Sequence, residues 1–397
     1  MSMSQQNTPL VWLSTLYFAK GIAYVMVMFL SLIMLKQMGL SSNAALSCVA
    51  LFYIPWITKF WWKPYVVRPQ HFTAWIAVSE LLLALSFALL SFFMASASCT
   101  IVMLLLVAWL TAIHNVAVDG LYRLLTRDNH LPTFVRVKEL ARKMAVIVGQ
   151  GVLVMMVGNL QVFYRYDRFY SWQATFYILA GMFLLFCMWH RAILPRHLHH
   201  TEDAIRRALP SLQDVGALYL FVYPFAVGLQ AKVGILFLLD APSSGGLGLS
   251  PQEFGLVMGT VGITGLTIGG MLGFRVLRRD GLSRWLWPMA LLMVVPCAVY
   301  ALMGYWEPSD LLTISLGVLL EQTSYGFGFA AYLWVLRHVA NREVGKSLMA
   351  LSLMVSCLLS GVLQSAVGYY YTFLIALVLS AAPLVSTWII RKNPTLK

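Results

Sequence analysis

The sequence predicts an all-α integral membrane protein, with twelve transmembrane helices in two six-helix bundles and both termini in the cytoplasm. Hydrophobic residues make up 60% of its 397 residues, charged residues make up only 11%, and the mean hydropathy is +0.77. A typical soluble domain carries about 25% charged residues, so a water-soluble fold of this length would have too few charges to cover its surface. Disordered chains are poor in aromatic residues, so the 13% aromatic content excludes disorder as well.

The apolar runs that predict these helices recur along the whole chain. A bilayer core of about 30 Å requires about 20 apolar residues per helix. The first run follows a polar start, MSMSQQNTPL, which lacks the basic segment and cleavage site of a signal peptide, so we expect a retained helix. The twelve expected spans cover residues 10–34, 44–62, 72–94, 99–121, 140–163, 172–194, 213–239, 253–277, 283–304, 311–337, 346–369 and 371–390.

The basic residues predict the orientation of these spans. With the N-terminus inside, 22 of the 28 Lys and Arg residues fall in inward segments, and only Lys36, Arg165 and Arg168 fall in outward ones. Cytoplasmic loops carry an excess of Lys and Arg, so this split favours twelve spans with both ends inside. It also accounts for the net charge of +13 without a nucleic-acid partner.

The longest polar break, residues 195–212, predicts the domain boundary. It separates an N-terminal six-helix bundle, residues 1–194, from a C-terminal one, residues 213–397. The break contains three histidines, His197, His199 and His200. These could bind a metal, but we favour a solvated cytoplasmic linker.

No sequence pattern indicates a cofactor or a catalytic centre. The five cysteines lie far apart and form no Cys-x-x-Cys pattern, so neither a disulfide framework nor a zinc site is indicated. The chain has no Gly-x-x-x-x-Gly-Lys-Ser/Thr run for ATP and no Gly-x-Ser-x-Gly elbow for a hydrolase. We therefore expect no cofactor, no metal and no enzymatic activity.

The loop after the eighth expected span carries a motif for a conformational latch. It reads GGMLGFRVLRRDGLSRWLW from Gly269 to Trp287, which is a small-residue helix end followed by basic residues and an Asp-Gly pair. This resembles the loop signature of the major facilitator superfamily, whose two six-helix bundles face each other across a central cavity. The expected latch residues are Gly273, Arg275, Arg279, Asp280 and Arg284. A plain positive-inside loop is the alternative.

Further stretches resemble the AmpG-type permeases, relatives of the acetyl-CoA transporters. The run Pro-x-x-x-Lys-Phe-x-Trp-x-Pro is formed by Pro55, Lys59, Phe60, Trp62 and Pro64. Asp119 ends an apolar-Ala-apolar-Asp stretch, with His114-Asn115 where the family usually has Gln-Asp. Residues 237–273 and 325–352 look like the family's seven-to-eight loop and ten-to-eleven junction. The resemblance implies the fold of these permeases but does not specify the substrate. AmpG-type permeases often have extra spans, so this chain looks more like the short members of the group, and some short relatives are siderophore permeases.

Charges inside the apolar runs identify the candidate site residues. Each costs about 2.5–3.5 kcal/mol at a helix centre, so such residues are usually functional. The embedded acids and bases are Glu80, Asp119, Glu321, Lys20, Lys232 and Lys59. In the superfamily that the chain resembles, spans one, four, seven and ten line the cavity. The resemblance therefore places Lys20, Asp119, Lys232 and Glu321 there.

We expect different roles for the acids and the bases. Glu321 and Asp119 are the candidate proton carriers, and a salt bridge from Asp119 to Arg142 or Arg123 is the structural alternative. Lys20 and Lys232 are candidate anion-binding groups, with ion pairs to those same acids as the alternative. Polar neighbours complete the expected substrate-binding set: Tyr24, Gln230, Gln322 and Tyr325.

The sequence thus favours a secondary active transporter. We expect a monomer in a bacterial inner membrane that imports a polar, anionic solute of the peptidoglycan-fragment type with protons by alternating access. A siderophore permease is a second hypothesis. A membrane-embedded acyl or glycosyl transferase, with His114 beside Asp119 as its only nearby catalytic candidate, is a third.

Overall fold

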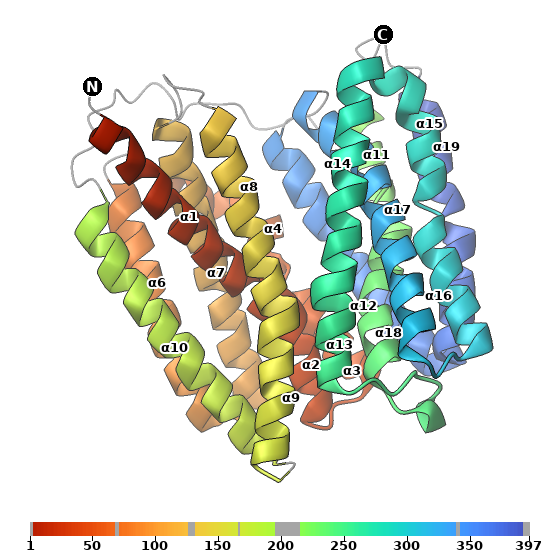
Figure 1. The fold of residues 1–397 in the computed structure, drawn as a ribbon, viewed down its shortest axis with the longest axis horizontal. Helices are drawn as coiled ribbons and strands as arrows, with labels where there is room; N and C mark the ends of the chain where they lie inside the picture. The colour runs from red at the N-terminus through yellow and green to blue at the C-terminus, as the bar shows by residue number, and fades with distance from the viewer. Residues whose placement is uncertain are drawn as a thin grey trace. The chain divides into compact units, whose positions relative to one another are not determined.

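The computed structural model describes residues 3–67, 71–125, 132–165, 167–194, 215–338 and 342–391, and these residues form helices joined by short turns (Figure 1). The expected linker at 195–212, with its three histidines, lies outside the described residues. The α-helices are α1 (Met3–Val25), α2 (Ser31–Gln37), α3 (Ser42–Leu51), α4 (Ile54–Ile57), α5 (Lys59–Val66), α6 (Phe72–Phe93), α7 (Ala97–Leu125), α8 (Pro132–Val146), α9 (Leu153–Phe163), α10 (Arg168–Ile193), α11 (Val215–Val222), α12 (Phe225–Leu239), α13 (Pro251–Leu256), α14 (Ile263–Asp280), α15 (Leu282–Leu292), α16 (Val295–Trp306), α17 (Leu311–His338), α18 (Arg342–Leu379) and α19 (Ala381–Ile390). Three π-helical segments join neighbouring helices: η1 (Met26–Leu30), η3 (Ile147–Val152) and η6 (Val257–Gly262). A short 3-10 helix, η5, spans Pro242–Ser244.

Nine helices within the described residues are long and apolar enough to cross a membrane, or ten if the bent pair at 42–66 is one span. One of the nine, Glu343–Ile390, has 48 residues and would be about 72 Å long at 1.5 Å per residue, more than twice the bilayer core. Gly368 interrupts it with a φ of 78°. Helix α17 is not among the nine, because the polar stretch Glu321–Tyr325 lies in its middle. The twelve-span count and its orientation therefore stay predictions.

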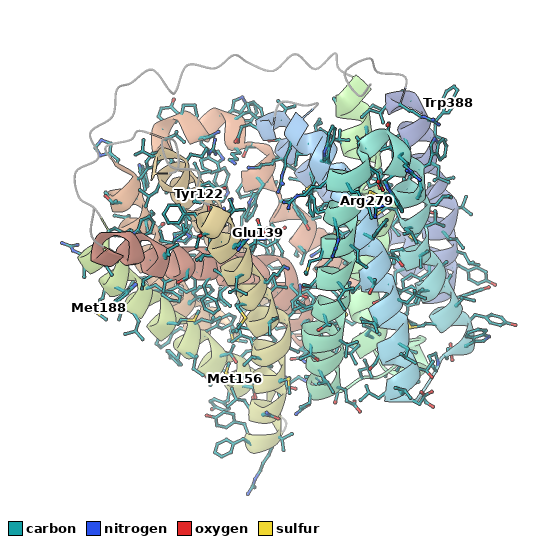
Figure 2. The ribbon with its side chains drawn as sticks, turned by 45° about the horizontal axis from the view of Figure 1, so that its top comes forward. Tyr122, Glu139, Met156, Met188, Arg279 and Trp388 are labelled. Carbon is teal, nitrogen blue, oxygen red and sulfur yellow. The ribbon has the colours of Figure 1, made fainter. Side chains whose placement is uncertain are left out.

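The exposed faces of these helices are apolar, as a lipid-facing surface requires. In unbroken helices that span a bilayer, the backbone satisfies its own hydrogen bonds, and the outer side chains meet lipid. Met188 on α10 and Trp388 on α19 point outward, with 54% and 53% of their surfaces exposed (Figure 2). These observations establish a multi-pass membrane protein.

The chain divides into two compact units. Unit 1 comprises residues 1–34 and 58–208, and unit 2 comprises residues 35–57 and 209–397. This differs from the expected bundles at residues 35–57, which the chain order assigns to the first half. The reason is local packing, because α3 lies against α18: Cys357 Sγ donates to the carbonyl oxygen of Leu46 at 3.2 Å. We describe each unit by itself.

Unit 1 is built around close contacts between its long helices. Helix α10 runs alongside α6 (Figure 1), and Phe87 on α6 packs between Phe176 and Phe183 on α10, with ring centroids 6.3 Å and 5.5 Å away. Gly21 on α1 lets α8 approach, because a Cβ added there would lie 2.4 Å from the Cβ of Ala145. Close packing therefore joins α6 to α10 and α1 to α8.

Unit 2 contains a close helix pair made by glycines. A Cβ added at Gly269 on α14 would lie 2.0 Å from the carbonyl oxygen of Thr323 on α17, and one at Gly326 would lie 2.5 Å from the carbonyl oxygen of Leu266. Small residues at such spacing let membrane helices pack backbone to backbone. The same pairing holds α17, which carries Glu321, against α14.

Candidate functional site

The structure brings together two of the predicted residues in unit 1. Lys20 Nζ on α1 lies 2.5 Å from Asp119 Oδ1 on α7, and the Tyr17 hydroxyl donates to the same oxygen at 3.0 Å. The two charged side chains are 19% and 21% exposed, so the pair is largely buried but not sealed. This contact is the ion pair that the sequence analysis gave as the alternative role of Lys20.

The two arginines expected as alternative partners of Asp119 make the following contacts. Arg142 Nη2 lies 3.2 Å from Glu139 Oε2, one turn along the same helix, α8. Arg123 Nε donates to the backbone carbonyl oxygen of Asp119 at 3.3 Å. Lys20 forms a salt bridge with the Asp119 carboxylate.

A second lysine, which sequence reasoning did not single out, joins this pair. Lys138 Nζ on α8 lies 4.5 Å from the ring centroid of Tyr122 and 5.1 Å from that of Tyr17. The two rings meet edge to face with centroids 5.7 Å apart. We call Tyr17, Lys20, Asp119, Tyr122 and Lys138 the basic–aromatic cluster. Figure 2 shows Tyr122 beside Glu139, where α7 and α8 approach each other.

Part of this cluster had a signal in the sequence. Tyr17 and Lys20, and likewise Asp119 and Tyr122, are three residues apart and so share a helix face. Lys138 had no such signal, because it reads as one of the basic residues of a cytoplasmic loop. Tyr24, expected to bind substrate, lies one turn beyond Lys20 and is more exposed than the cluster.

Glu321 occupies a buried polar position in unit 2. Its side chain on α17 is 2% exposed, and Oε2 has no hydrogen-bond partner among the described residues. Gln322, the next residue in the chain, lies close to its carboxyl group. A charge in this place costs several kcal/mol unless it is paired. Glu321 can therefore hold a proton or receive a hydrogen bond from a solute.

Gln230 and Tyr300 belong to the same neighbourhood. Gln230 on α12 is 1% exposed and its Oε1 has no hydrogen-bond partner within the described part of the chain. A Cβ at Gly234 would meet the Tyr300 ring at 2.8 Å and Gln230 Nε2 at 3.2 Å, and Tyr300 lies within electrostatic range of Glu321. Three helices, α12, α16 and α17, thus supply polar groups to this site.

The other predicted members of unit 2 lie on the same helices. Lys232 on α12 is half-buried and within electrostatic range of Cys357 on α18. Tyr325 on α17 stacks on Phe329, with centroids 5.1 Å apart. Lys232 thus shares α12 with Gln230, and Tyr325 follows Glu321 by one turn of α17.

Unit 2 contains a hydrogen-bonded group of polar and charged side chains around Asp240 that was not predicted from the sequence. Lys36 Nζ, at the end of α2, lies 3.0 Å from Asp240 Oδ2 and 2.7 Å from Ser42 Oγ. Tyr369 on α18, next to the bend at Gly368, donates its hydroxyl to the same Asp240 oxygen at 2.5 Å. The partners are too far apart in the chain for any local pattern to join them.

The expected latch residues lie in the C-terminal half of α14 and, for Arg284, at the start of α15. Gly273 faces α17, where an added Cβ would lie 2.8 Å from the Ala330 Cβ, whereas Arg275, Arg279 and Arg284 are exposed. Asp280 Oδ2 accepts a hydrogen bond from Trp285 Nε1 at 2.8 Å. Arg279 Nε is 3.6 Å from the other carboxylate oxygen of Asp280. Both of these contacts of Asp280 are thus with residues near it in the chain.

The resemblance-motif residues surround the break between α4 and α5. Pro55 is buried in α4, and Pro64 lies inside α5. Lys59 is 8% exposed, and Trp62 packs against Trp109 with centroids 6.0 Å apart. These residues therefore shape the break and its packing.

No group of three or more His, Cys, Asp or Glu side chains within the described residues could hold a metal ion. The histidines at 197, 199 and 200, which we expected to be solvated, lie outside those residues. The described residues thus offer no metal site to compare with those of known proteins, and the comparison rests on the fold.

The chain was compared with known proteins. No protein-family model matches it. A Haemophilus influenzae protein with the name "Uncharacterized protein" is 23% identical over 360 residues, which cover 82% of this chain and 81% of that protein.

Solved structures of transporters share the fold over nearly the whole chain. A point mutant of the nucleoside transporter NupG has a TM-score of 0.66 at 13% identity and covers 96% of this chain and 98% of that one. A bacterial homologue of the iron transporter ferroportin, in an inward-facing state, has a TM-score of 0.67 at 16% identity and covers 98% of each. The chain is similar to both and has the major facilitator fold.

Proposed function

We propose that the protein is a proton-coupled secondary active transporter that imports a polar, anionic solute of the peptidoglycan-fragment type across a bacterial inner membrane. The observation that carries this proposal is the pair of largely buried polar sites within the helical units, Lys20–Asp119 in unit 1 and Glu321 in unit 2. Ionisable residues inside membrane spans are expensive and usually mark solute or proton pathways. The major facilitator fold supports alternating access between two bundles as the mechanism.

A proton gradient is the energy source that the residues favour. The chain has no nucleotide-binding run, and a membrane potential supplies about 2.3 kcal/mol per charge per 100 mV. When its carboxyl group is protonated, a buried residue such as Glu321 is neutral while the protein changes between its inward-facing and outward-facing states. Coupling follows if solute binding and protonation stabilise the same conformation.

The basic–aromatic cluster favours an anionic solute with apolar or ring surfaces. Its charged members are two lysines and one aspartate, and its tyrosines offer stacking faces. A solute carboxylate can replace the Asp119 carboxylate as a partner of Lys20. Few polar groups against an apolar wall are typical of small-molecule sites.

The proposal is tested by uptake into proteoliposomes under an imposed proton gradient. Muropeptides, a carboxylate siderophore and a nucleoside are offered in parallel at equal concentration. Accumulation of the muropeptide alone supports the proposal. Accumulation of the siderophore or the nucleoside alone would show that the solute belongs to that class and not to the peptidoglycan fragments. If none of the three accumulates under the gradient, the proposal is contradicted.

Neutralising either candidate anion-binding lysine should weaken binding of the anionic solute. We expect Lys20→Gln and Lys232→Gln each to cost about 1.5–3 kcal/mol, the usual value of a hydrogen bond to a charged group. A neutral amide analogue of the solute should be almost unaffected. Isothermal titration with both ligands measures this, and Lys143→Gln, the same chemical change on α8, is the control. Equal losses for both ligands would assign the lysines to the fold.

The latch variants should shift the conformational equilibrium. Gly273→Leu separates α14 from α17, and Asp280→Asn removes the one negative charge of the loop. Both should disfavour the outward-facing state, because the cytoplasmic side would close less well. Cysteine accessibility on the two sides of the membrane measures the shift, with the exposed Ser283→Ala as the control. Unchanged labelling in both variants would exclude the latch.

A further inference from the structure

Four polar side chains meet in the core of unit 1. We call them the histidine cluster: Thr15 on α1, Glu80 on α6, His114 on α7 and His190 on α10. Glu80, His114 and His190 are all 0% exposed. His114 Nε2 lies 3.1 Å and His190 Nδ1 lies 2.7 Å from the same oxygen, Glu80 Oε1. On its other side, His190 Nε2 lies 2.9 Å from the Thr15 hydroxyl.

The hydrogen-bond pattern assigns the protons of Glu80 and His114. Glu80 Oε1 lies within hydrogen-bond distance of one nitrogen of each ring, whereas Oε2 has no hydrogen-bond partner among the described residues. A proton on Oε2 would therefore be a buried donor without an acceptor, which is costly. The same holds for His114 Nδ1, which also has no partner there. A Glu80 carboxylate and a neutral His114 with its proton on Nε2 fit this pattern without an unpaired donor.

His190 is the member that can exist in two protonation states. The Thr15 hydroxyl is also 3.0 Å from the carbonyl oxygen of Trp12. When it donates to that carbonyl, its oxygen accepts from Nε2–H, and His190 is an imidazolium. When it donates to Nε2, His190 is neutral. The two states differ in their hydrogen bonds only by a rotation of one hydroxyl group.

The charge balance couples this proton to the packing of the helices. In the imidazolium state the cluster is neutral, because His190 balances Glu80. After the proton leaves, Glu80 is a buried charge with no cation in the cluster, and such a charge is strongly destabilising. The nearly parallel Phe186 ring, with its centroid 5.9 Å away, also favours the imidazolium.

The surrounding helices contribute few other charges. On α10, Cys187 lies within electrostatic range of Glu80, and the exposed Arg191 acts on Cys187. On α1 and α7, the nearest charges along the chain are Lys20 and Asp119, which pair with each other. Helix α6 carries no ionisable residue besides Glu80.

We propose that the histidine cluster is a proton-binding site, in which His190 binds one proton at Nε2 and releases it past the hydroxyl of the partly buried Thr15. On release the N–H bond breaks, its electron pair stays on Nε2, and the proton passes to water. The buried packing of α1, α6, α7 and α10 is then less stable than one in which water reaches Glu80. The use of this proton in coupling rests on the proposed transport function, but its presence does not.

Nitrogen-15 solid-state NMR of the full chain in lipid bilayers, labelled only at histidine, tests the site. Ring shifts distinguish the imidazolium from each neutral tautomer, and His190→Gln assigns the His190 signals. As the pH is raised over the range in which the full chain stays folded, we expect His190 to change from two protonated nitrogens to Nδ1–H alone. His114 should keep its proton on Nε2 throughout. A single protonation state of His190 over this range, or a change at His114 instead, would overturn the proposal.

Variants at Thr15 separate the proton site from a purely structural role. Thr15→Val removes the acceptor of Nε2–H, so His190 should stay neutral over the same range, and Thr15→Ser should restore the titration. Ser14→Ala, which removes a hydroxyl from the neighbouring position, should leave it unchanged. A wild-type titration in Thr15→Val would contradict the proposal. Titration of His190 in a protein that shows no proton-driven uptake would refute the transport function and leave the site intact.

Discussion

Replacing Glu321 with Gln should abolish gradient-driven solute accumulation while counterflow exchange survives. The amide has nearly the shape of the protonated carboxyl group but cannot release a proton, so binding and conformational exchange remain possible without coupling. The position is suited to this change, since Glu321 is 2% exposed and an uncharged group there avoids the cost of a buried charge. Accumulation and counterflow in the same proteoliposomes measure the two activities.

The control for this prediction is Glu253→Gln in the same unit. Glu253 closes a capping box with Ser250 at the start of α13, so it loses a local hydrogen bond but no buried acid. Accumulation should persist there. Loss of both activities in Glu321→Gln, with normal folding, would assign Glu321 to structure. If the Glu321→Gln variant still accumulates solute, the coupling proton is carried by Asp119 or His190 instead, and the Asp119→Asn variant decides between these two.

Gly269→Ala should cause a large loss of stability through the α14–α17 contact. The new methyl group would lie 2.0 Å from the Thr323 carbonyl oxygen and 3.0 Å from the Phe327 backbone nitrogen, so the helices must separate. Overpacking of this kind costs about 1–3 kcal/mol. The midpoint of thermal unfolding in detergent should fall, and uptake should fall with it because α17 carries Glu321.

The neighbouring glycine provides a matched control. At Gly270 an added Cβ meets only the Gly326 carbonyl oxygen, at 3.9 Å, which is an ordinary contact. Gly270→Ala should therefore stay within about 0.5 kcal/mol of the wild type. Equal stability of the two alanine variants would show that backbone contact does not limit the approach of α14 and α17.

The helices and the membrane class could be predicted because their signals are local. Apolar runs, their polar breaks and the glycines near Gly273 are visible within 20 residues, and most described helices overlap an expected span. The packing of residues 35–57 with unit 2 could not be predicted, because it depends on the contact of α3 with α18 and not on chain order.

The site could be predicted only in part because its partners are distant in sequence. Lys20 and Asp119 were identified as embedded charges, yet nothing in the sequence decided whether they bind each other or a solute. Glu80 stood out for the same reason, but its partner His190 lies in a different expected span and has an ordinary apolar context. Lys138 and Asp240 were missed, because each reads as a charge at a helix end.

The most direct test of coupled transport is the lumen pH of proteoliposomes that contain a trapped pH indicator. A solute gradient is imposed inward, with equal pH on both sides and no nucleotide present. Proton symport predicts that the lumen acidifies on addition of the anionic solute, and that Glu321→Gln removes this signal while labelled solute still exchanges. Solute entry without any change in lumen pH would contradict the account.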